Sequence, residues 1–457
     1  MNRSAAALRD IAHTLHGFSE LKALREKGPT VITGGRGIWV FDETGTPYIE
    51  GASGMWCATF GFGEQELIDA AIEQMRKLPY YHSVAYKTNT PSIDLAERLA
   101  AMVPVKGAKL NFCLSGSEAN DFLVKMIRFY NNAIGRPDKK KIIARTNGYH
   151  GATMMATSLT GIAANHQGFD LPLPGVIHVS DPKKFANGLQ NETDADFAAR
   201  LCRELEERIL AEGPDTVAAF IAEPVTGAGG VVIPPDGYYQ GVQAVLKRYD
   251  ILFLADEVIT GFHRTWNLWG SNTMGVTPDT MTLAKGITSG YQPLGAIVIS
   301  DEIYQGLEHG SAKSGWFGHG TTYAGHPVSC AVALKVLDLI KTRNIEAHVN
   351  RVAPVFAKRL DMFKDHPYVG EVRHIGLMGA IEFVANPKTK APFQPKGSFA
   401  KAVRDRAEEK HHIICRTLAG GDSCAFSPPL IITETEINEM FDRFTRALNE
   451  ITAEYGK

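Results

Sequence analysis

The stretch GYYQGVQAVLKRYDILFLADEV, residues 237–258, decides the fold of this 457-residue chain. Its first part, residues 237–250, has the apolar spacing of an amphipathic helix. The remainder, residues 251–258, is a short apolar run that carries two acids near its end. Because the strands of a parallel sheet are buried on both faces and alternate with helices, this order favours a helix-covered parallel sheet.

The same alternation of helix and apolar run extends along the middle of the chain. Helical spacing recurs at residues 65–77, 92–102 and 195–211, and the last of these precedes an apolar run at 216–225. We therefore predict an α/β fold whose large domain, built around a mainly parallel sheet, spans residues 61–325.

Both ends of the chain depart from this pattern. Residues 36–50 alternate apolar and polar side chains around a turn, which predicts a β-hairpin. A long helix at 326–342 precedes a segment at 372–384 that suits a small α+β domain. We expect residues 1–60 to form part of this small domain, with residues 326–457 as its C-terminal portion.

Composition and charge exclude several classes of partner. The net charge is −2, so nothing attracts the chain generally to nucleic acid or to an anionic membrane. The six cysteines form no CxxC pair and no disulfide framework, which favours a reducing compartment. No apolar stretch approaches the about 18 residues of a membrane span, and the first residues show no cleavable signal. We expect a soluble cytoplasmic protein without a metal site.

Two predicted strands end in acids: Glu223 follows one, and Asp256 with Glu257 follows the other. A buried carboxylate is costly unless a partner uses its charge, although a helix cap or an ion pair often explains a single one. In doubly wound sheets, ligands bind beyond the carboxyl ends of the strands. Lys285 follows a third short apolar run, within TLAKGITSGYQPLG. A lysine at the mouth of a pocket can form a Schiff base.

Two loop motifs accompany these strand ends. In FCLSGSEAND, Ser115 and Glu118 fit a capping box, and such a helix start also suits a phosphate. In NGYHGAT, Tyr149 lies where an aromatic ring could stack on a planar cofactor, although a structural turn is the simpler interpretation of this motif alone. The chain has no P-loop and no GxGxxG sequence.

One cofactor would use all of these parts. A lysine can bind its aldehyde, a carboxylate can hold its protonated pyridine nitrogen, and a helix start can bind its phosphate. Lys285, Asp256 and the helix that starts near residue 116 therefore indicate pyridoxal 5'-phosphate (PLP).

Along almost its whole length the sequence resembles the class III PLP-dependent aminotransferases, which have fold type I, the aspartate aminotransferase-like fold. The resemblance rests on the motifs SGSEAND, GYHGAT, EPVTGAGG, LFLADEVITGFHRTW, TTYAGHP and VRHIGLMGAIE, in the order typical of that family. GMWC at 54–57 and IICRTLAGGD at 413–422 favour its ω-transaminase, or amine:pyruvate, branch. The resemblance implies ping-pong transfer of an amino group from an ω-amino acid or amine donor to a keto acid, expected to be pyruvate.

The resemblance also implies roles for the residues around the cofactor ring. Lys285 would be the Schiff-base lysine and the proton carrier, and Asp256 would pair with the pyridine nitrogen. Val258 and Tyr149 would pack on opposite faces of the ring, with His150 beside Tyr149.

For the phosphate, the resemblance implies Gly116 and Ser117, with Thr322 reaching across from the neighbouring subunit. Glu223 would support the cofactor nearby. Such enzymes are homodimers with active sites at the subunit interface, and we expect the same arrangement in this protein.

For the substrate, the resemblance implies that Arg416 binds the keto-acid carboxylate and swings away for donors that lack one. Trp56, Tyr81 and Tyr149 would line an aromatic pocket suited to apolar or aryl amines. Phe18 would contribute to this pocket from the N-terminal segment.

Some positions depart from the pattern of the family. His263 and Trp266 stand where glycine is common, Leu114 replaces a polar residue, and Gly17 replaces a proline. Aminomutases and decarboxylases of the same fold type use the same lysine and aspartate, so they are alternatives to an aminotransferase. A non-catalytic PLP-binding protein is a further alternative, although binding alone would not require the complete catalytic set.

Overall fold

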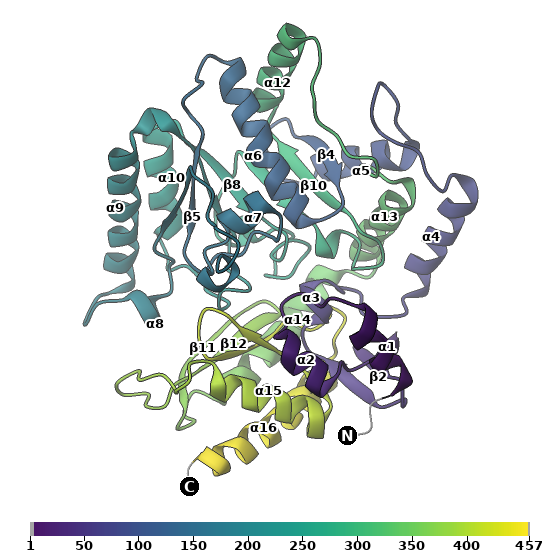
Figure 1. Cartoon of the computed structure of the whole chain (residues 1–457), viewed down its shortest axis with the longest axis vertical. Coiled ribbons are helices and arrows are strands. Elements are labelled where there is room, and N and C mark those ends of the chain that lie inside the picture. Colours follow the sequence, from purple (N-terminus) through teal and green to yellow (C-terminus); the bar gives the residue numbers. More distant parts are fainter. Residues whose placement is uncertain (1–3, 456–457) are drawn as a thin grey trace.

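The computed structural model describes residues 4–455, which form two connected parts (Figure 1). The upper part in that view is built on a seven-stranded sheet with the order β4-β10-β9-β8-β7-β5-β6. β10 runs against its neighbours and the other six strands share one direction, so the sheet is mainly parallel, as predicted. Its strands are β4 Lys109–Cys113, β5 Lys141–Arg145, β6 Val176–Val179, β7 Val217–Ala222, β8 Leu252–Asp256, β9 Thr280–Leu283 and β10 Gly295–Ile299.

Helices cover both faces of this sheet, as alternate residues of β7 show. Phe220 and Ala222 pack into a hydrophobic cluster with side chains of α9 and α10. Ala219 and Ile221 point the other way, into a cluster with side chains of α6. The helices of this part are α4 Gln65–Lys77, α5 Thr90–Ala100, α6 Gly116–Ala133, α7 Met154–Leu159, α8 Lys184–Asn187, α9 Asp194–Glu212, α10 Tyr238–Arg248, α11 Gly270–Thr273, α12 Asp301–Ser314 and α13 Pro327–Thr342.

The lower part combines both ends of the chain (Figure 1). Strand β13 pairs in parallel with β3, so that Ile413 lies opposite Ile49 and Ile414 opposite Glu50. One of its sheets has the order β1-β2-β3-β13 and the other the order β11-β12-β15-β14. Its elements are α1 Ala5–His13, α2 Leu21–Lys27, β1 Ile32–Arg36, β2 Trp39–Asp42, β3 Pro47–Glu50, α3 Ser53–Trp56, α14 Ile345–Asp361, β11 Val369–Ile375, β12 Met378–Phe383, α15 Ser398–His411, β13 Ile413–Ile414, β14 Arg416–Leu418, β15 Ser423–Phe426 and α16 Glu434–Tyr455.

Most of the predicted elements are confirmed. β2 and β3 form the hairpin predicted over residues 36–50, and the helices predicted at 65–77 and 326–342 are α4 and α13. α13 packs mainly against α4 and α5 of the upper part. The domain limits after residues 60 and 325 stay predictions. In the part of the chain that the structure describes, no helix is long and apolar enough to cross a membrane.

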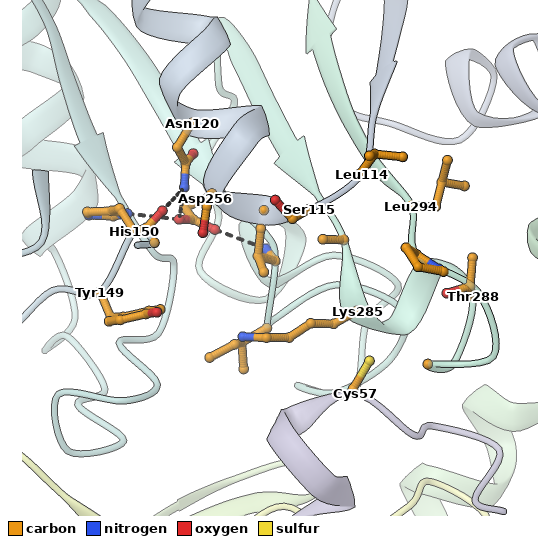
Figure 2. A pocket seen from close by; sticks show the side chains of 18 of the residues that line it. Cys57, Leu114, Ser115, Asn120, Tyr149, His150, Asp256, Lys285, Thr288 and Leu294 are labelled. Atoms are coloured by element: carbon orange, nitrogen blue, oxygen red, sulfur yellow. Dashed lines mark hydrogen bonds and ion pairs between the residues drawn. The ribbon is translucent and has the colours of Figure 1, made fainter. Parts of the chain in front are cut away.

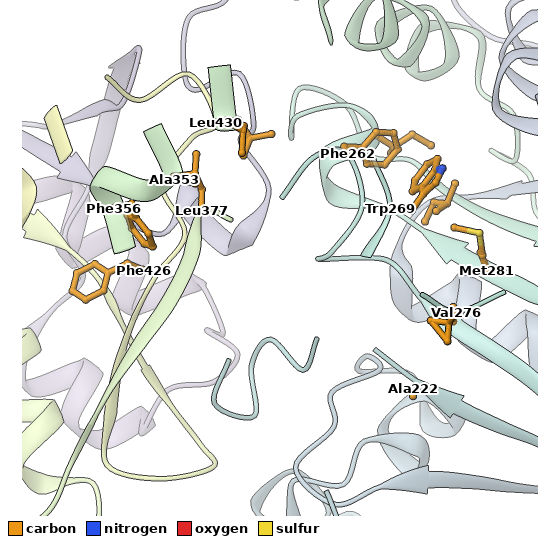
Figure 3. Close-up of a cluster of buried hydrophobic side chains, with 14 of the residues drawn as sticks. Ala222, Phe262, Trp269, Val276, Met281, Ala353, Phe356, Leu377, Phe426 and Leu430 are labelled. Carbon is orange, nitrogen blue, oxygen red and sulfur yellow. The ribbon is translucent and has the colours of Figure 1, made fainter. Parts of the chain in front are cut away.

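Arg264, in the loop after β8, joins the two parts. Its carbonyl accepts a hydrogen bond from the Leu377 N–H at 3.1 Å. Its guanidinium donates to the carbonyl of Leu377 at 3.0 Å and to that of Pro428 at 2.6 Å. Figure 3 shows that side chains of both parts, among them Trp269 and Phe356, belong to one buried cluster. This shared core fixes the space between the two parts.

The loop around Arg264 has an unusual backbone. Phe262, His263 and Trp266 adopt left-handed φ angles of 58°, 67° and 77°. Such angles favour glycine, because in other residues the Cβ crowds the following carbonyl. The geometry explains why glycine suits positions 263 and 266, and why the two large residues there cost conformational energy.

At Gly376 the backbone of the lower part lies very close to that of the upper part. Its φ is +55°, and an added Cβ would lie 2.3 Å from the Arg264 carbonyl oxygen and 2.8 Å from Thr265 Cα. We expect Gly376→Ala to destabilise the protein by about 3 kcal/mol, because backbone would have to move. The measurement is the shift in thermal unfolding temperature.

Gly237→Ala is the matched control for this variant. Gly237 has a φ of +83°, and an added Cβ would meet nothing within 4 Å. This change should therefore cost only the left-handed strain of about 1–2 kcal/mol. Equal shifts for the two variants would show that the contact at Gly376 is not tight.

Candidate active site

A cavity of about 360 Å³ lies at the carboxyl edge of the seven-stranded sheet, and we call it the sheet-edge cavity (Figure 2). Glu223 follows β7, Asp256 ends β8, and Lys285 comes shortly after β9. Gly116 begins α6, which follows β4. Because these strands run in one direction, their ends meet at one edge, and all four residues line the cavity.

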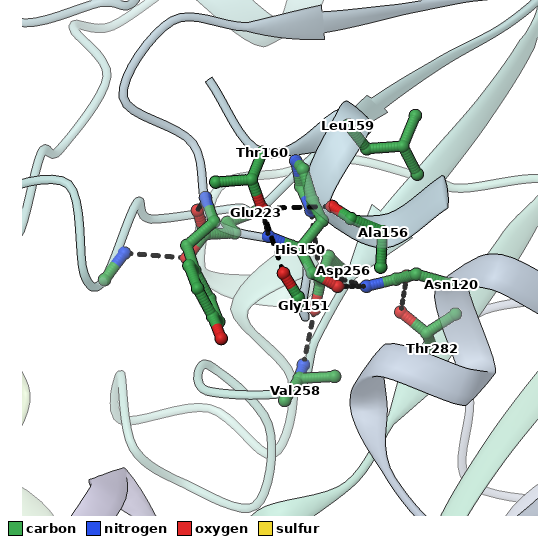
Figure 4. Close-up of polar contacts among 12 residues, drawn as sticks. Asn120, His150, Gly151, Ala156, Leu159, Thr160, Glu223, Asp256, Val258 and Thr282 are labelled. Carbon is green, nitrogen blue, oxygen red and sulfur yellow. Dashed lines mark hydrogen bonds and ion pairs between the residues drawn. The ribbon is translucent and has the colours of Figure 1, made fainter. Parts of the chain in front are cut away.

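Asp256 is a buried acid with fixed orientation (Figure 4). Its Oδ2 accepts a hydrogen bond from Asn120 Nδ2 and lies within hydrogen-bond distance of His150 Nδ1, both at 2.8 Å. Its Oδ1 accepts the Val258 N–H at 3.1 Å. Asn120 is itself held by the Thr282 hydroxyl at 2.9 Å. A carboxylate has about four acceptor positions, so Oδ1 keeps one for a ligand in the cavity.

Lys285 reaches into the same cavity from a strained backbone. Its φ is +49°, in the left-handed region that costs a lysine about 1–2 kcal/mol. Burial lowers the pKa of Lys285 below its usual value, and the attraction of Asp256 only partly opposes this effect. The lowered pKa favours a neutral amine, which is the nucleophilic form.

The start of α6 is a capping box, as the sequence predicts. The Glu118 N–H donates to Ser115 Oγ at 3.1 Å, and the Leu114 N–H donates to Glu118 Oε2 at 2.8 Å. Gly116 lies against Val258, because an added Cβ would come within 2.8 Å of its Cγ2. The helix N-terminus therefore opens into the cavity at its first residue, where its amides suit an anion.

The 147–153 loop forms another part of the cavity wall, next to the start of α6. The Ala152 N–H donates to Ser117 Oγ at 3.0 Å, which leaves the hydroxyl proton of Ser117 free to donate. The Tyr149 N–H donates to Glu223 Oε1 at 3.0 Å. Burial raises the pKa of Glu223. Glu223 thus holds the loop that carries Tyr149 into the cavity.

A second cavity of about 420 Å³, the aromatic chamber, adjoins the first and shares Lys285 and Tyr149 with it. Phe18, Trp56 and Arg416 also line this chamber. The ring of Phe18 lies edge-on to that of Tyr149 with the centroids 6.3 Å apart. Four of the five residues predicted to contact substrate thus surround one space that ends at Lys285.

Tyr81 and Thr322 line neither of these cavities. Tyr81 is 39% exposed, and Thr322 is exposed on a neighbouring segment where its carbonyl accepts the Tyr80 hydroxyl at 3.0 Å. Within one chain the structure therefore does not bring these two predicted residues to the site. His263 and Trp266 also lie outside both linings.

Sequence reasoning missed other residues of the site. Asn120, which fixes Asp256, stands within the SGSEAND motif, so the motif could have indicated it. Cys57, the last residue of GMWC, and Thr288, within TLAKGITSGYQPLG, also line the sheet-edge cavity, although sequence reasoning gave neither a role. Leu114, a departure from the family pattern, lies in the same lining.

A lysine of lowered pKa, a carboxylate with a free acceptor position and an open helix N-terminus surround one cavity at the edge of a parallel sheet. The aldehyde, the ring nitrogen and the phosphate of PLP need these three groups, so the residues present fit this cofactor. The fold and the cavity define a PLP-dependent enzyme of fold type I.

Comparisons with known proteins agree with this class. The model of the family "Aminotransferase class-III" matches residues 23–448. Gamma aminobutyrate transaminase 3, chloroplastic, of Solanum lycopersicum is 45% identical over 423 residues, which cover 92% of this chain and 81% of that protein. The ω-transaminase from Pseudomonas jessenii in complex with PMP has a TM-score of 0.97 and 46% identity, covering 99% of each chain. A transaminase solved with L-ala has a TM-score of 0.91 and 45% identity, covering 93% of this chain and 100% of that one.

The chain belongs to the class III aminotransferase family. It is a PLP-dependent aminotransferase, and its solved neighbours are ω-transaminases. The predictions of family, fold type, cofactor and aminotransferase activity are confirmed, and aminotransfer is favoured over the aminomutase, decarboxylase and non-catalytic alternatives.

Glu257, the acid next to Asp256, has a different position. It is fully buried and does not line the cavity. Its Oε1 accepts the N–H and the hydroxyl of Ser271, both at 2.6 Å. Its Oε2 accepts the Gly270 N–H at 2.9 Å and the Thr260 hydroxyl at 2.5 Å. Glu257 thus stabilises the loop after β8 by accepting its hydrogen bonds, whereas Asp256 faces the cavity.

The two neighbouring acids should therefore respond differently to mutation. Asp256→Asn removes a negative charge from the cavity, and we expect turnover to fall by at least about a hundredfold. Glu257→Ala leaves buried donors without an acceptor, and we expect a loss of stability of at least about 3 kcal/mol. Turnover and thermal unfolding of both variants check this contrast, and a Glu257→Ala protein as stable as the wild type would contradict it.

Proposed function

We propose that this aminotransferase transfers the amino group of an ω-amino acid, or of an apolar or aryl amine, to pyruvate. The aromatic chamber carries the proposal, because it meets the sheet-edge cavity at Lys285 and contains both aromatic walls and Arg416. Aromatic walls suit the apolar body of an amine, and a guanidinium suits a carboxylate. One chamber can therefore accept the donor and the keto acid in turn, as ping-pong kinetics require.

Related proteins support the choice of substrates. The tomato relative is named for γ-aminobutyrate, an amino acid whose amino group is at the ω end. One solved neighbour contains L-ala, which is the product expected from pyruvate. A variant of another neighbour was engineered for asymmetric synthesis of enantiopure bulky amines.

The residues of the sheet-edge cavity would share the work of the reaction. PLP, when bound, supplies an aldehyde and an electron-withdrawing ring. Lys285 would hold the cofactor and, once the amine substrate has displaced it, carry the substrate proton as a neutral base. The free acceptor position of Asp256 would keep the ring nitrogen protonated, and Gly116 with Ser117 would bind the phosphate.

The proposal includes a homodimer. The segments around residues 80–86 and 316–323 form one surface, since the Tyr80 hydroxyl donates to the Thr322 carbonyl at 3.0 Å. Large exposed hydrophobic patches mark interaction surfaces. The exposed aromatic residues here are Tyr80, Tyr81, Tyr86, Trp316 and Tyr323. We infer that a second copy covers this surface, and that Thr322 and Tyr81 act in the neighbouring active site.

A cytoplasmic location is part of the same proposal and rests on the sequence alone. Relatives include proteins named as chloroplastic and mitochondrial.

The visible absorption spectrum of the holoenzyme tests the proposed reaction. We expect an amine donor to remove the absorption band of bound PLP and pyruvate to restore it, because each half-reaction changes the form of the cofactor. In Lys285→Ala, turnover should fall by at least about a hundredfold, since the proton carrier is lost. The control is Lys401→Ala, on an exposed face of α15. A band that no amine changes would contradict the proposal.

Arg416→Ala tests dual recognition of the substrates. We expect kcat/KM for pyruvate to fall by about ten- to a hundredfold, which corresponds to charged hydrogen bonds of about 1.5–3 kcal/mol. The value for 1-phenylethylamine, which has no carboxylate, should change by less than about threefold. Arg404→Ala is the matched control, because Arg404 lines the same chamber but is paired with Asp405. Equal losses for the two substrates in Arg416→Ala would exclude this role.

A further inference from the structure

Arg416 lies in the wall of the aromatic chamber without an acidic partner. Within residues 4–455 its guanidinium forms no ion pair, and its recorded side-chain contact is between Nη1 and the sulfur of Met55. Burial lowers the pKa of Arg416 below its usual value. A half-buried guanidinium without a partner is free to respond to any negative charge that comes close.

Glu50 is the acid that the fold brings near Arg416. It ends β3 and is only 6% exposed. The register of β3 and β13 places Glu50 opposite Ile414, two positions before Arg416, and the Gly51 N–H donates to the Ile414 carbonyl at 2.9 Å. The Glu50 Oε1 accepts the Ala52 N–H at 3.0 Å, and in the described chain Glu50 has no ion pair either.

We propose that Glu50 is a positioning residue for Arg416: when ionised it attracts the guanidinium away from substrate, and when protonated it releases the guanidinium to a substrate carboxylate. This inference rests on the proposed function, because it requires a keto acid bound by Arg416. It goes further by making the choice of amino acceptor depend on pH.

The electrostatics of Glu50 support this role. Burial raises the pKa of Glu50 to about 7, against the opposing effects of hydrogen bonds from the Ala52 and Gly54 N–H groups and of the Arg416 charge. Glu408, on α15, raises the pKa of Glu50 as well. Three titratable side chains interact with Arg416, namely Glu50, Tyr149 and Arg404, and Glu50 has the largest effect on the pKa of Arg416 after burial.

The direction of the pH effect follows from these signs. Below about pH 7 Glu50 is mostly neutral, and Arg416 is available to a carboxylate. Above that pH the ionised Glu50 competes for Arg416, so a carboxylate substrate should bind less well. Conversely, a carboxylate ligand beside Arg416 should favour the protonated form of Glu50, so that binding takes up a proton.

The test compares two acceptors of three carbons, pyruvate and propanal, with the holoenzyme between pH 6 and 8.5. The ratio of their kcat/KM values cancels every titration that both acceptors share, including that of Lys285. In the wild type we expect the pyruvate:propanal ratio to fall by about tenfold as the pH rises, the factor of one pKa unit of coupling. In Glu50→Gln the ratio should stay high at every pH, because the isosteric amide is neutral and still accepts the Ala52 N–H.

Glu408→Gln is the control, because it removes a carboxylate that lines the aromatic chamber, whereas Glu50 is not part of that lining. Glu408 raises the pKa of Glu50, so this variant should keep the fall in the ratio and move it to lower pH. An unchanged pH dependence in Glu50→Gln would overturn the inference. Absence of pyruvate turnover at all pH values would instead refute the proposed function, so the two failures are distinguishable.

A binding measurement tests the proposed role of Glu50 without any variant. Propionate has a carboxylate and no carbonyl to react, and its binding to the wild-type holoenzyme is measured by calorimetry at pH 7.5 in phosphate and in Tris. We expect the two binding enthalpies to differ by the difference between the ionisation heats of the two buffers, multiplied by the fraction of a proton that Glu50 takes up. Equal enthalpies in the two buffers would overturn the inference.

Discussion

The rest of the site depends on a single buried carboxylate at the edge of a parallel sheet. The carboxyl ends of the strands meet at this edge, and the buried charge of Asp256 needs hydrogen-bond partners there. Three elements satisfy that charge: Asn120 from α6, His150 from the 147–153 loop and the Val258 N–H. Each of them also forms a wall of the cavity. The hydrogen bonds that stabilise the buried charge of Asp256 therefore also position the walls of the sheet-edge cavity.

The strained backbone of Lys285 determines where its amine lies. A left-handed lysine persists only where its surroundings fix the backbone, and α13 packs against the short helical turn that begins at Lys285. This backbone brings the amine to the junction of the two cavities. One side chain can therefore serve the cofactor on one side and the substrate on the other.

The sequence predicts the strand ends well, because they follow from local pattern and one topological rule. It selects Asp256 for the ring nitrogen but leaves Glu257 without a role. Successive residues leave a strand on opposite sides, so Asp256 faces the cavity whereas Glu257 binds the loop after β8. Asn120 lies within the SGSEAND motif, but its contact with Asp256 is not predicted, because the two residues are 136 positions apart in the chain. Tyr81 and Thr322 lie on the surface of the chain, outside both cavities, so their roles stay predictions.

In the proposed function, the upper part of the chain provides the reacting groups and the lower part selects the substrate. Lys285, Asp256 and Gly116 belong to the upper part, whereas Trp56 and Arg416 come from elements of the lower part. The aromatic chamber thus lies where the parts meet, and its shape depends on how they are joined. The bonds of Arg264 to the lower part and the shared hydrophobic core set that geometry. A change in the short strands that carry Arg416 can therefore alter the choice of substrate while the hydrogen bonds around Asp256 stay intact.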